Sequence, residues 1–281
     1  MKTGFELVSL SVKYPFQKVW ALKDVSLTIS PGTFTVVLGA NGSGKSTLIK
    51  CLAGSQRWTQ GTLSLDGRSR AVDNTNFNAQ QILVSEDIIL PDFTIARLVH
   101  TYQKIWTDFD QSTFERIMKY SNLARDKTPK ELSRGQRVLL QFGLALGTQV
   151  PIILVDEVTA TLDPFVRRKV VEELDQHARR SGTVVMATNI ASETQHVNSQ
   201  LVLINNGIVF KTGEHHQIRQ QFVKKYFENS KVDNMNPLWV EVSRDDEGIF
   251  AVTERESKEG GDSALVTLEE MFTYLVEKAK R

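Results

Sequence analysis

The sequence GANGSGKST at residues 39–47 directly follows FTVVL at residues 34–38. A short, continuously apolar run is typical of a strand covered on both faces of a parallel sheet. The nine residues after it fit the pattern G-x-x-x-x-G-K-[ST] at every fixed position. Glycines let the backbone curl, so that successive amide N–H groups and the start of the next helix bind phosphate oxygens. The stretch predicts a phosphate loop in an α/β fold.

The polar residues of this loop have distinct expected partners. Lys45 supplies positive charge to the β and γ phosphates, Ser46 supplies a hydroxyl to Mg²⁺, and Thr47 donates on the α-phosphate side. A chance match in a chain of this length is on the order of one in a hundred, which argues against a mere glycine-rich turn. The residues predicted to bind nucleotide here are Gly39, Asn41, Gly42, Ser43, Gly44, Lys45, Ser46 and Thr47.

Composition narrows the class of protein. With 281 residues, 41% hydrophobic and 24% charged, the chain is long enough for one large core and an appendage. Its 34 basic and 33 acidic residues nearly balance, so no nucleic acid partner is expected. A single cysteine, Cys51, excludes an intramolecular disulfide and favours a reducing compartment, which makes the cytoplasm the expected location. No membrane span or secretion signal is expected.

The pattern of apolar residues outlines the rest of the fold. Residues 5–12 and 24–30 alternate apolar and polar, as half-buried antiparallel strands do. Between about 94 and 147 the pattern becomes helical, which predicts a helical insert. Further short apolar runs typical of buried strands occur at residues 151–155, 183–187 and 201–204. The alternation of strands and helices predicts a layered α/β domain.

The sequence pattern after about residue 215 differs from that of the α/β domain. A polar connection begins after about residue 215, and two strand-like runs at 238–244 and 249–255 then flank the turn residues DDEG. These runs predict a hairpin. The closing segment TLEEMFTYLVEK begins with a capping box and predicts a helix that packs Leu268, Met271, Phe272 and Leu275 on one face.

Two carboxylates end the apolar run of residues 152–155. Ligands bind at the carboxyl ends of strands in α/β sheets, so Asp156 and Glu157 are expected to face the phosphate loop. Asp156 is predicted to hold Mg²⁺ through water, and Glu157 to act as the general base on the attacking water. Taken alone, two carboxylates at a strand end are about equally well explained as a solvated turn. The phosphate loop in the same chain favours the functional explanation over the turn.

A second predicted anion site lies at residues 131–146, ELSRGQRVLLQFGLAL. Ser133 is a suitable cap for the apolar helix that follows, and Gly135 permits a close backbone approach. Placed between a phosphate loop and an acidic strand end, this segment resembles the LSGGQ signature of ATP-binding cassette proteins, with Arg134 in place of the first glycine. The resemblance covers residues 3–215. It implies a P-loop NTPase core with an antiparallel β subdomain and a helical subdomain at about 87–147, and leaves residues 216–281 as a small α+β appendage.

The resemblance also implies how the site is assembled. Two nucleotide-binding subunits face head to tail, and ATP on one phosphate loop is covered by the signature of the other. The signature residues acting on the partner's nucleotide would be Ser133, Arg134, Gly135 and Gln136.

Further residues match the family one by one. Asp163, in TATLDP, is expected at the dimer interface, with a helix cap as the alternative. Tyr14 is expected to stack on adenine, with packing on the sheet beside Phe16 and Trp20 as the alternative. Residues 91–94, PDFT, resemble the start of the helical subdomain, which receives a helix of the membrane subunits.

The chain departs from the family at two positions. Where members carry a glutamine that contacts Mg²⁺ and water, this chain has Ser85 or Glu86, and Glu86 is the candidate metal ligand. Where members carry a histidine that contacts the γ-phosphate, this chain has Asn189, with His196 as a weaker substitute. Asparagine can donate a hydrogen bond but carries no charge, and such a loss costs about 2 to 4 kcal/mol in the transition state.

Three functions are compatible with the sequence. The leading one is the ATP-hydrolysing subunit of a membrane transporter, on the inner face of the membrane, in the bacterial exporter branch that moves peptides, antibiotics or lipids. The second is a degenerate subunit that binds ATP but hydrolyses it slowly beside a more active partner. The third is a soluble member of the family acting on ribosomes or DNA, which the neutral charge and short insert disfavour.

Overall fold

The computed structural model divides the chain into two compact units. The first comprises Met1–Asn189 and Leu201–Thr212, and the second Ile190–Gln200 and Gly213–Arg281. The residues that the structure describes are 4–69, 80–121, 123–180, 182–228, 239–244, 248–254 and 266–278. The mixed α/β class predicted from the sequence is confirmed.

A six-stranded sheet organises the first unit, with the strand order β10-β9-β3-β8-β7-β6. Its strands are β3 (Phe34–Leu38), β6 (Gln81–Ser85), β7 (Ile152–Asp156), β8 (Thr183–Thr188), β9 (Gln200–Asn205) and β10 (Ile208–Glu214). Every residue of β3 and β8 is buried, as their continuous apolar sequences predict. The neighbours β3 and β8, β8 and β7, and β7 and β6 all pair in parallel. Their carboxyl ends therefore meet at one edge.

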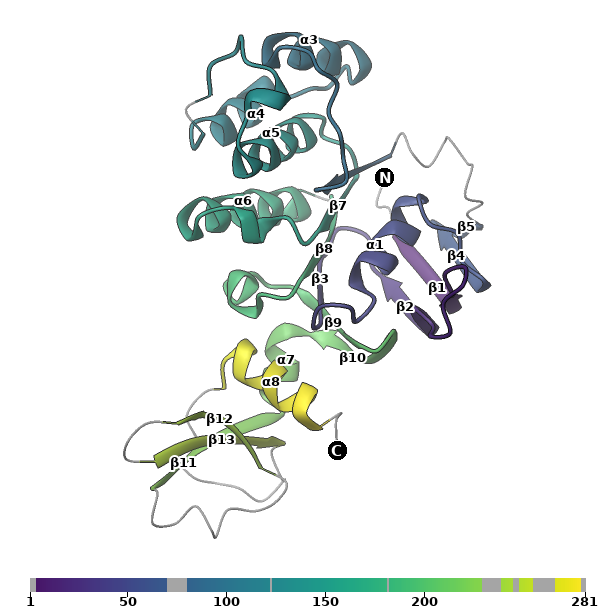
Figure 1. Cartoon of the computed structure of the whole chain (residues 1–281), viewed down its shortest axis with the longest axis vertical. Helices are drawn as coiled ribbons and strands as arrows, with labels where there is room; N and C mark the ends of the chain where they lie inside the picture. The colour runs from purple at the N-terminus through teal and green to yellow at the C-terminus, as the bar shows by residue number, and fades with distance from the viewer. Residues whose placement is uncertain are drawn as a thin grey trace. The chain divides into compact units, whose positions relative to one another are not determined.

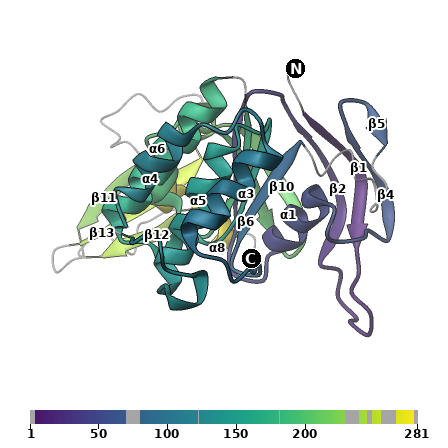
Figure 2. The same ribbon diagram turned by 90° about the horizontal axis from the view of Figure 1, so that it is seen from above.

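A second, antiparallel sheet covers one side of helix α1 (Lys45–Ala53). It has the order β2-β1-β4-β5, formed by β1 (Phe5–Val12), β2 (Leu22–Ile29), β4 (Gln60–Leu65) and β5 (Arg68–Ser69). Leu48, Ile49, Cys51 and Leu52 of α1 are buried between apolar residues of both sheets. Figure 2 shows α1 beside β1 and β2. This core fixes the start of α1, which is where the predicted phosphate loop ends.

Helices fill the region between residues 94 and 147 that the sequence predicts to be helical. They are α3 (Ile95–Ile105), α4 (Gln111–Met118) and α5 (Arg134–Gly147). Figure 1 shows these three helices grouped together. Helix α6 (Pro164–Arg179) follows β7 after the short 3-10 helix η2 (Thr159–Thr161) and lies on the face of the six-stranded sheet opposite α1 (Figure 1).

The second unit contains a small antiparallel sheet of order β11-β13-β12. Its elements are η3 (Ala191–Thr194), α7 (His215–Arg219), β11 (Phe222–Glu228), β12 (Val240–Arg244), β13 (Gly248–Glu254) and α8 (Leu268–Lys278). The pairing of β12 with β13 confirms the predicted hairpin. Strand β11 was not expected, because Lys224 and Lys225 in its middle make the segment read as a polar connection.

Helix α8 has the predicted capping box. The Glu270 amide donates to Thr267 Oγ1 at 3.2 Å, and the Thr267 amide donates to Glu270 Oε2 at 2.8 Å. Its buried face consists of Leu268, Met271, Tyr274 and Leu275. Phe272, which was expected on this face, is half-buried. Tyr274 is buried in its place and packs edge-on against Phe222, so the phenol ring gains an aromatic neighbour.

Candidate nucleotide-binding site

The loop of residues 39–47 connects β3 to α1, as predicted, and close packing explains two of its glycines. Gly44 caps α1 in a left-handed conformation with φ 109°, which disfavours any side chain. A Cβ there would lie 2.5 Å from the Ala21 carbonyl oxygen. A Cβ at Gly39 would lie 2.4 Å from Ser43 Oγ and 2.5 Å from the Ile204 carbonyl oxygen. The loop thus follows a path that only glycine permits at both ends.

The ammonium group of Lys45 is buried and fully hydrogen-bonded. It donates to the carbonyl oxygens of Gly39 at 2.8 Å and Ala40 at 2.9 Å, and it lies 2.7 Å from Glu157 Oε1. The Lys45 side chain is only 1% exposed. Three acceptors match the three N–H groups of an ammonium, so the buried charge is compensated. A phosphate oxygen that reached Lys45 would have to displace one of these acceptors, and Glu157 is the only one of the three that is a side chain.

Glu157 follows the end of β7 in a strained backbone conformation. Its φ is 51°, in the left-handed region, and its amide donates to the Ala187 carbonyl at 3.1 Å. Holding a residue other than glycine there costs about 1 to 2 kcal/mol. That conformation turns the chain at the strand end while the Glu157 carboxylate reaches Lys45. Strain of this kind is common where a side chain must be aimed at a ligand.

Asp156, the last residue of β7, has a poorly solvated carboxylate. Its Oδ1 is buried without a hydrogen-bond partner among the residues the structure describes. Burial raises the pKa of Asp156 above its usual range, while a hydrogen bond from the Ser46 hydroxyl partly opposes this shift. An unpartnered carboxylate oxygen beside a hydroxyl is a suitable pair of hard ligands for Mg²⁺. Asp156 and Ser46 therefore fit the predicted cation, which when bound would offset the charge of nucleotide phosphates.

The structure brings Asn189 to the phosphate loop. Asn189 follows β8, the neighbour of β3, and is exposed. Its Nδ2 donates to Asn41 Oδ1 at 2.9 Å, although the two residues are 148 positions apart in the chain. An exposed amide at this place can donate to an anion after a change of partner. His196, the weaker substitute, is exposed and belongs to the second unit.

Tyr14 is tied to the same loop through its hydroxyl. The Tyr14 hydroxyl lies 3.1 Å from Thr47 Oγ1, within hydrogen-bond distance, and the residue is half-buried. The nearby Phe16 is fully exposed, and Lys13 Nζ lies 5.6 Å from the centre of the Trp20 ring. The Tyr14 hydroxyl thus lies beside the first turn of α1, and stacking of its ring on adenine stays a prediction.

The predicted signature residues form a second group, at the start of α5. Ser133 caps the helix: its Oγ accepts from the Gln136 amide at 3.2 Å, and its own amide donates to Gln136 Oε1 at 3.0 Å. A Cβ on Gly135 would lie 3.0 Å from the Thr161 carbonyl oxygen, so the backbone there is closely packed. The Arg134 guanidinium binds the carboxylate of Glu86, with Nε 2.8 Å from Oε1.

Asp163 takes the position of a helix cap. Its Oδ1 accepts from the amides of Phe165 and Val166, each at 3.1 Å, at the start of α6. The carboxylate is exposed. This contact accounts for an aspartate before Pro164, and a role at a dimer interface stays a prediction.

Ser85 and Glu86, the two alternatives for the family's glutamine position, differ in their exposure to solvent. Ser85 is the last residue of β6, buried, and pairs with Asp156 in the register of the sheet. Glu86 is exposed. Gln141, which sequence reasoning missed, accepts from the Ser85 amide at 3.2 Å through its Oε1. The available signal was a glutamine on the otherwise apolar face of α5.

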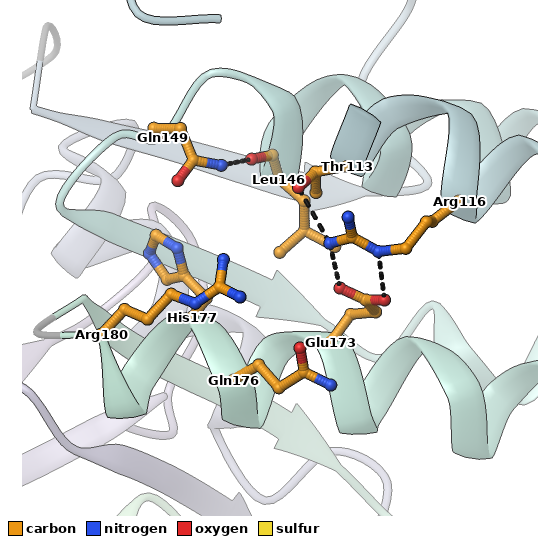
Figure 3. Close-up of a pocket in the computed structure, with 8 residues that line it drawn as sticks. All are labelled: Thr113, Arg116, Leu146, Gln149, Glu173, Gln176, His177 and Arg180. Atoms are coloured by element: carbon orange, nitrogen blue, oxygen red, sulfur yellow. Dashed lines mark hydrogen bonds and ion pairs between the residues drawn. The ribbon is translucent and has the colours of Figure 1, made fainter. Parts of the chain in front are cut away.

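A small pocket lies among α4, α5 and α6, where one ion pair joins two of the helices. Arg116 forms two bonds of 3.0 Å to the carboxylate of Glu173, which links α4 to α6 (Figure 3). The residues around it are Thr113, Arg116, Leu146, Gln149, Glu173, Gln176, His177 and Arg180. Burial lowers the pKa of His177, which favours its neutral form at neutral pH.

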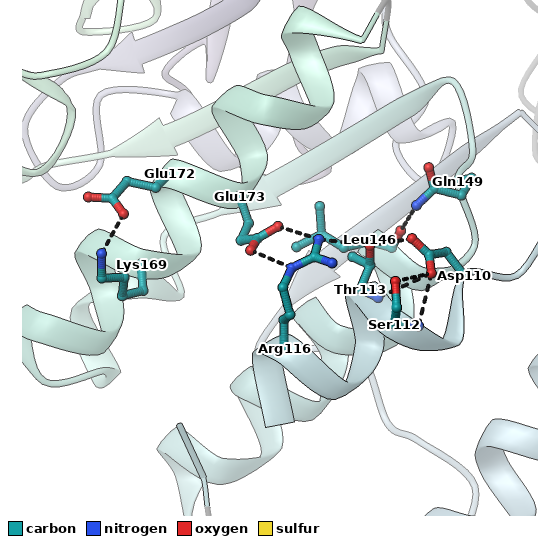
Figure 4. Close-up of polar contacts among 9 residues, drawn as sticks. All are labelled: Asp110, Ser112, Thr113, Arg116, Leu146, Gln149, Lys169, Glu172 and Glu173. Atoms are coloured by element: carbon teal, nitrogen blue, oxygen red, sulfur yellow. Dashed lines mark hydrogen bonds and ion pairs between the residues drawn. The ribbon is translucent and has the colours of Figure 1, made fainter. Parts of the chain in front are cut away.

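The neighbouring polar contacts also have structural explanations. Asp110 caps α4 by accepting from the amides of Ser112 at 2.9 Å and Thr113 at 3.2 Å (Figure 4). Hydrogen bonds from the same two residues hold the pKa of Asp110 at about 2. Arg116, Glu173 and Asp110 thus have partners within the subunit, and these contacts link α4 to α6 and cap the start of α4.

These contacts define a nucleotide-binding α/β protein of the P-loop type. Residues 22–160 match the family model described as ABC transporter, so the chain carries a domain of that family. The predicted resemblance is therefore confirmed. The chain is an ATPase of this family and an ATP-binding subunit of the transporter kind.

Several curated relatives of the chain are named as import proteins. The chain is 26% identical to the spermidine/putrescine import ATP-binding protein PotA of Thermotoga maritima, over 94% of this chain and 76% of that protein. It is 28% identical to the sulfate/thiosulfate import ATP-binding protein CysA of Synechococcus elongatus, over 72% of this chain and 60% of that protein. These names do not include an exporter, so the predicted exporter branch is not supported by them.

Solved structures agree in fold. One described as the ATP-binding subunit of an ABC transporter has a TM-score of 0.67 at 23% identity, covering 77% of this chain and 92% of that chain. A bacterial Atm1-family ABC exporter with ATP bound has a TM-score of 0.67 at 19% identity, covering 78% of this chain and 40% of that chain. Among the residues the structure describes, no helix is both long and apolar enough to span a membrane.

The raised pKa of Asp156 predicts that Asp156→Asn stabilises the empty protein at neutral pH. Burial disfavours the charged carboxylate in the folded chain relative to the unfolded chain, and asparagine removes this cost. The gain should shrink as the pH falls through the raised pKa, because the wild-type side chain then becomes neutral. The free energy of unfolding, measured with urea at neutral pH and at about pH 4, checks this.

Asp92→Asn is the control of opposite sign. A hydrogen bond from Lys130 lowers the pKa of Asp92, so its replacement should bring no gain at neutral pH. A loss of stability in Asp156→Asn at neutral pH would contradict the assignment of an uncompensated charge.

Proposed function

We propose that the chain binds and hydrolyses ATP to power a membrane transporter, and that ATP closes a dimer with a second such subunit. The observation that carries the proposal is the contact of Lys45 with Glu157 at 2.7 Å, in a loop that Asn189 also reaches. Segments that are far apart in the chain thus contribute a cation, a carboxylate and an amide to one edge of the sheet. This is the set of groups that phosphoryl transfer to water requires.

In the proposed mechanism the γ-phosphate replaces Glu157 as the partner of Lys45. Lys45 then stabilises negative charge on the phosphate, and the released Glu157 carboxylate accepts a proton from the attacking water. Ser46 and Asp156 would hold Mg²⁺, which supplies charge compensation to the phosphates. Ser133 and Gly135 of the facing subunit would donate to the γ-phosphate, and Tyr14 would stack on the base.

A slow turnover is the second part of the proposal. Asn189 offers an amide where a charged or chargeable group would stabilise the γ-phosphate more strongly. Its Nδ2 is already bonded to Asn41 at 2.9 Å, so contact with phosphate would cost that bond. Glu86 places a carboxylate one residue after Ser85, which pairs with Asp156 in the sheet. These departures favour a subunit that binds ATP more readily than it hydrolyses it.

The partners follow from the proposed role. A transporter subunit of this kind would sit on the cytoplasmic face of the membrane, held there by membrane-spanning subunits. Its dimer partner would be a second copy or a related chain. We propose residues 1–215 as the working ATPase domain and residues 216–281 as an appendage.

The proposed dimer predicts a result for Glu157→Gln. The variant keeps a hydrogen-bonding group beside Lys45 but cannot accept the proton, so bound ATP should persist and hold two copies together. With ATP and Mg²⁺ we expect gel filtration to show a dimer, and with ADP a monomer.

Lys45→Ala in the same background is the matched control, because it removes the charge that binds phosphate. We expect it to remain a monomer with ATP. A monomeric Glu157→Gln protein at saturating ATP would refute closure between two copies of this chain.

The proposed slow turnover predicts a gain for Asn189→His. Imidazole reaches further than an amide and can carry positive charge to the γ-phosphate. We expect kcat for ATP hydrolysis to rise about 30-fold or more, with a much smaller change in ATP affinity. Steady-state hydrolysis and binding of a fluorescent ATP analogue measure the two effects separately.

His196→Ala serves as the control for the other histidine candidate and should leave kcat unchanged. An unchanged kcat in Asn189→His would mean that Asn189 does not limit the reaction.

Export as the direction of transport is a separate proposal, supported by the LSRGQ sequence at residues 132–136. It can be tested with the complete transporter in inside-out vesicles, where ATP added outside reaches this subunit. Export predicts accumulation of the peptide, antibiotic or lipid inside these vesicles. Depletion of cargo loaded inside them would instead assign import, in line with the names of the curated relatives.

A further inference from the structure

Arg134 and Glu86 form an ion pair that joins the signature helix to the end of strand β6. Arg134 Nε donates to Glu86 Oε1 at 2.8 Å, and its Nη2 donates to both carboxylate oxygens. Both side chains are accessible, at 65% and 40% exposure. A planar fork on a carboxylate has well-defined geometry, yet an exposed pair contributes only modestly to stability. The pair therefore has a defined geometry, but little free energy is needed to break it.

The backbone around Glu86 is held from both sides. Gln141 of α5 accepts from the Ser85 amide at 3.2 Å. Lys50 of α1 binds Asp87 Oδ2 at 2.7 Å. The segment is thus attached to the phosphate-loop helix on one side and to the signature helix on the other. These contacts flank Glu86 on both sides in the chain, while its exposed side chain binds Arg134.

The position of Glu86 gives its carboxylate a competing partner. Ser85, the preceding residue, pairs with Asp156 in the sheet, and Asp156 is the carboxylate that fits Mg²⁺. Glu86 therefore follows the strand that ends beside the cation site. A divalent cation bound with nucleotide there would attract a carboxylate more strongly than an exposed guanidinium does.

The pair also hides a positive charge at the start of α5. Arg134 is the first residue of this helix, after the cap Ser133, where backbone N–H groups favour anions. Bound to each other, the Arg134 guanidinium and the Glu86 carboxylate carry no net charge as a pair. Released, the guanidinium would add a full charge and a fork suited to phosphate. Asn189, in contrast, brings no charge to the site.

We propose that Glu86 acts as a latch on Arg134. In the empty subunit Glu86 holds the guanidinium within its own chain. Binding of ATP with Mg²⁺ in that subunit draws Glu86 away, and Arg134 then binds the phosphates of the nucleotide carried by the facing subunit. This inference rests on the proposed head-to-tail dimer. Its consequence is that occupancy of one nucleotide site prepares the other.

A double-mutant cycle tests the latch in the Glu157→Gln background. Glu86→Ala, Arg134→Ala and the double variant are compared by the ATP concentration that produces half the dimer, measured by light scattering. Each titration is run with EDTA and again with Mg²⁺. With EDTA the latch stays closed in the parent, so Glu86→Ala should lower the half-dimer ATP concentration about twofold to fivefold. In the Arg134→Ala background the same change should have no effect.

With Mg²⁺ the latch is open in the parent, so this advantage of Glu86→Ala should disappear. The latch would be overturned if Glu86→Ala changed the half-dimer ATP concentration equally with and without Arg134. It would also be overturned if this change were the same in EDTA and in Mg²⁺. A parent that never dimerises would overturn the proposed dimer together with the latch. A parent that dimerises without coupling between the two residues would overturn the latch alone.

The matched control pair is Arg244 with Glu241 in the second unit. It is also a forked pair, with Nε 2.9 Å from Oε1 and Nη2 2.7 Å from Oε2, and its exposure of 54% and 39% is similar. The same cycle on this pair should show no coupling in dimer formation. Coupling there would mean that the measurement reports surface charge and not a latch.

Discussion

The buried ammonium of Lys45 is the contact on which the arrangement of the site depends. A buried charge must be compensated, and here two loop carbonyls and one carboxylate supply the acceptors. The carbonyls belong to the loop after β3, whereas Glu157 follows β7, with β8 lying between the two strands. One side chain therefore links the ends of two strands that are not neighbours in the sheet. The same demand for acceptors makes the empty loop receptive to phosphate, because an anion can satisfy Lys45 at least as well as Glu157 does.

Much of the fold could be predicted because its signals are local. The apolar runs of β3 and β8 and the capping box of α8 each follow from a few neighbouring residues. Strand β11 could not be predicted in the same way, since two lysines interrupt its apolar pattern and only its pairing with β13 reveals it. The helix face of α8 was predicted with Phe272, whereas Tyr274 is the buried residue, because the aromatic partner Phe222 comes from a distant segment.

The candidate site shows the same limit. The sequence motifs indicate that Lys45 and Asp156 lie in one nucleotide site. They do not indicate which groups form hydrogen bonds or ion pairs with these two residues when no ligand is bound. The contact of Asn189 with Asn41 joins residues 148 positions apart and depends on the adjacency of β3 and β8. Gln141 appears in the sequence as a polar interruption of an apolar helix face, and only the structure shows its bond to the Ser85 amide. Contacts between residues that are distant in the chain therefore determine the hydrogen bonds of the site, and local sequence patterns do not reveal them.

The burial of Cys51 has a practical consequence. This thiol is the single cysteine in the chain and lies in α1, fully enclosed between the two sheets. Reagents that modify thiols in folded proteins would find it inaccessible, so cysteines introduced at the surface can carry spectroscopic probes without first removing the native one. The native thiol becomes reactive only when α1 separates from a sheet. Its rate of modification in increasing denaturant would then report the opening of this core, separately from any change in the second unit.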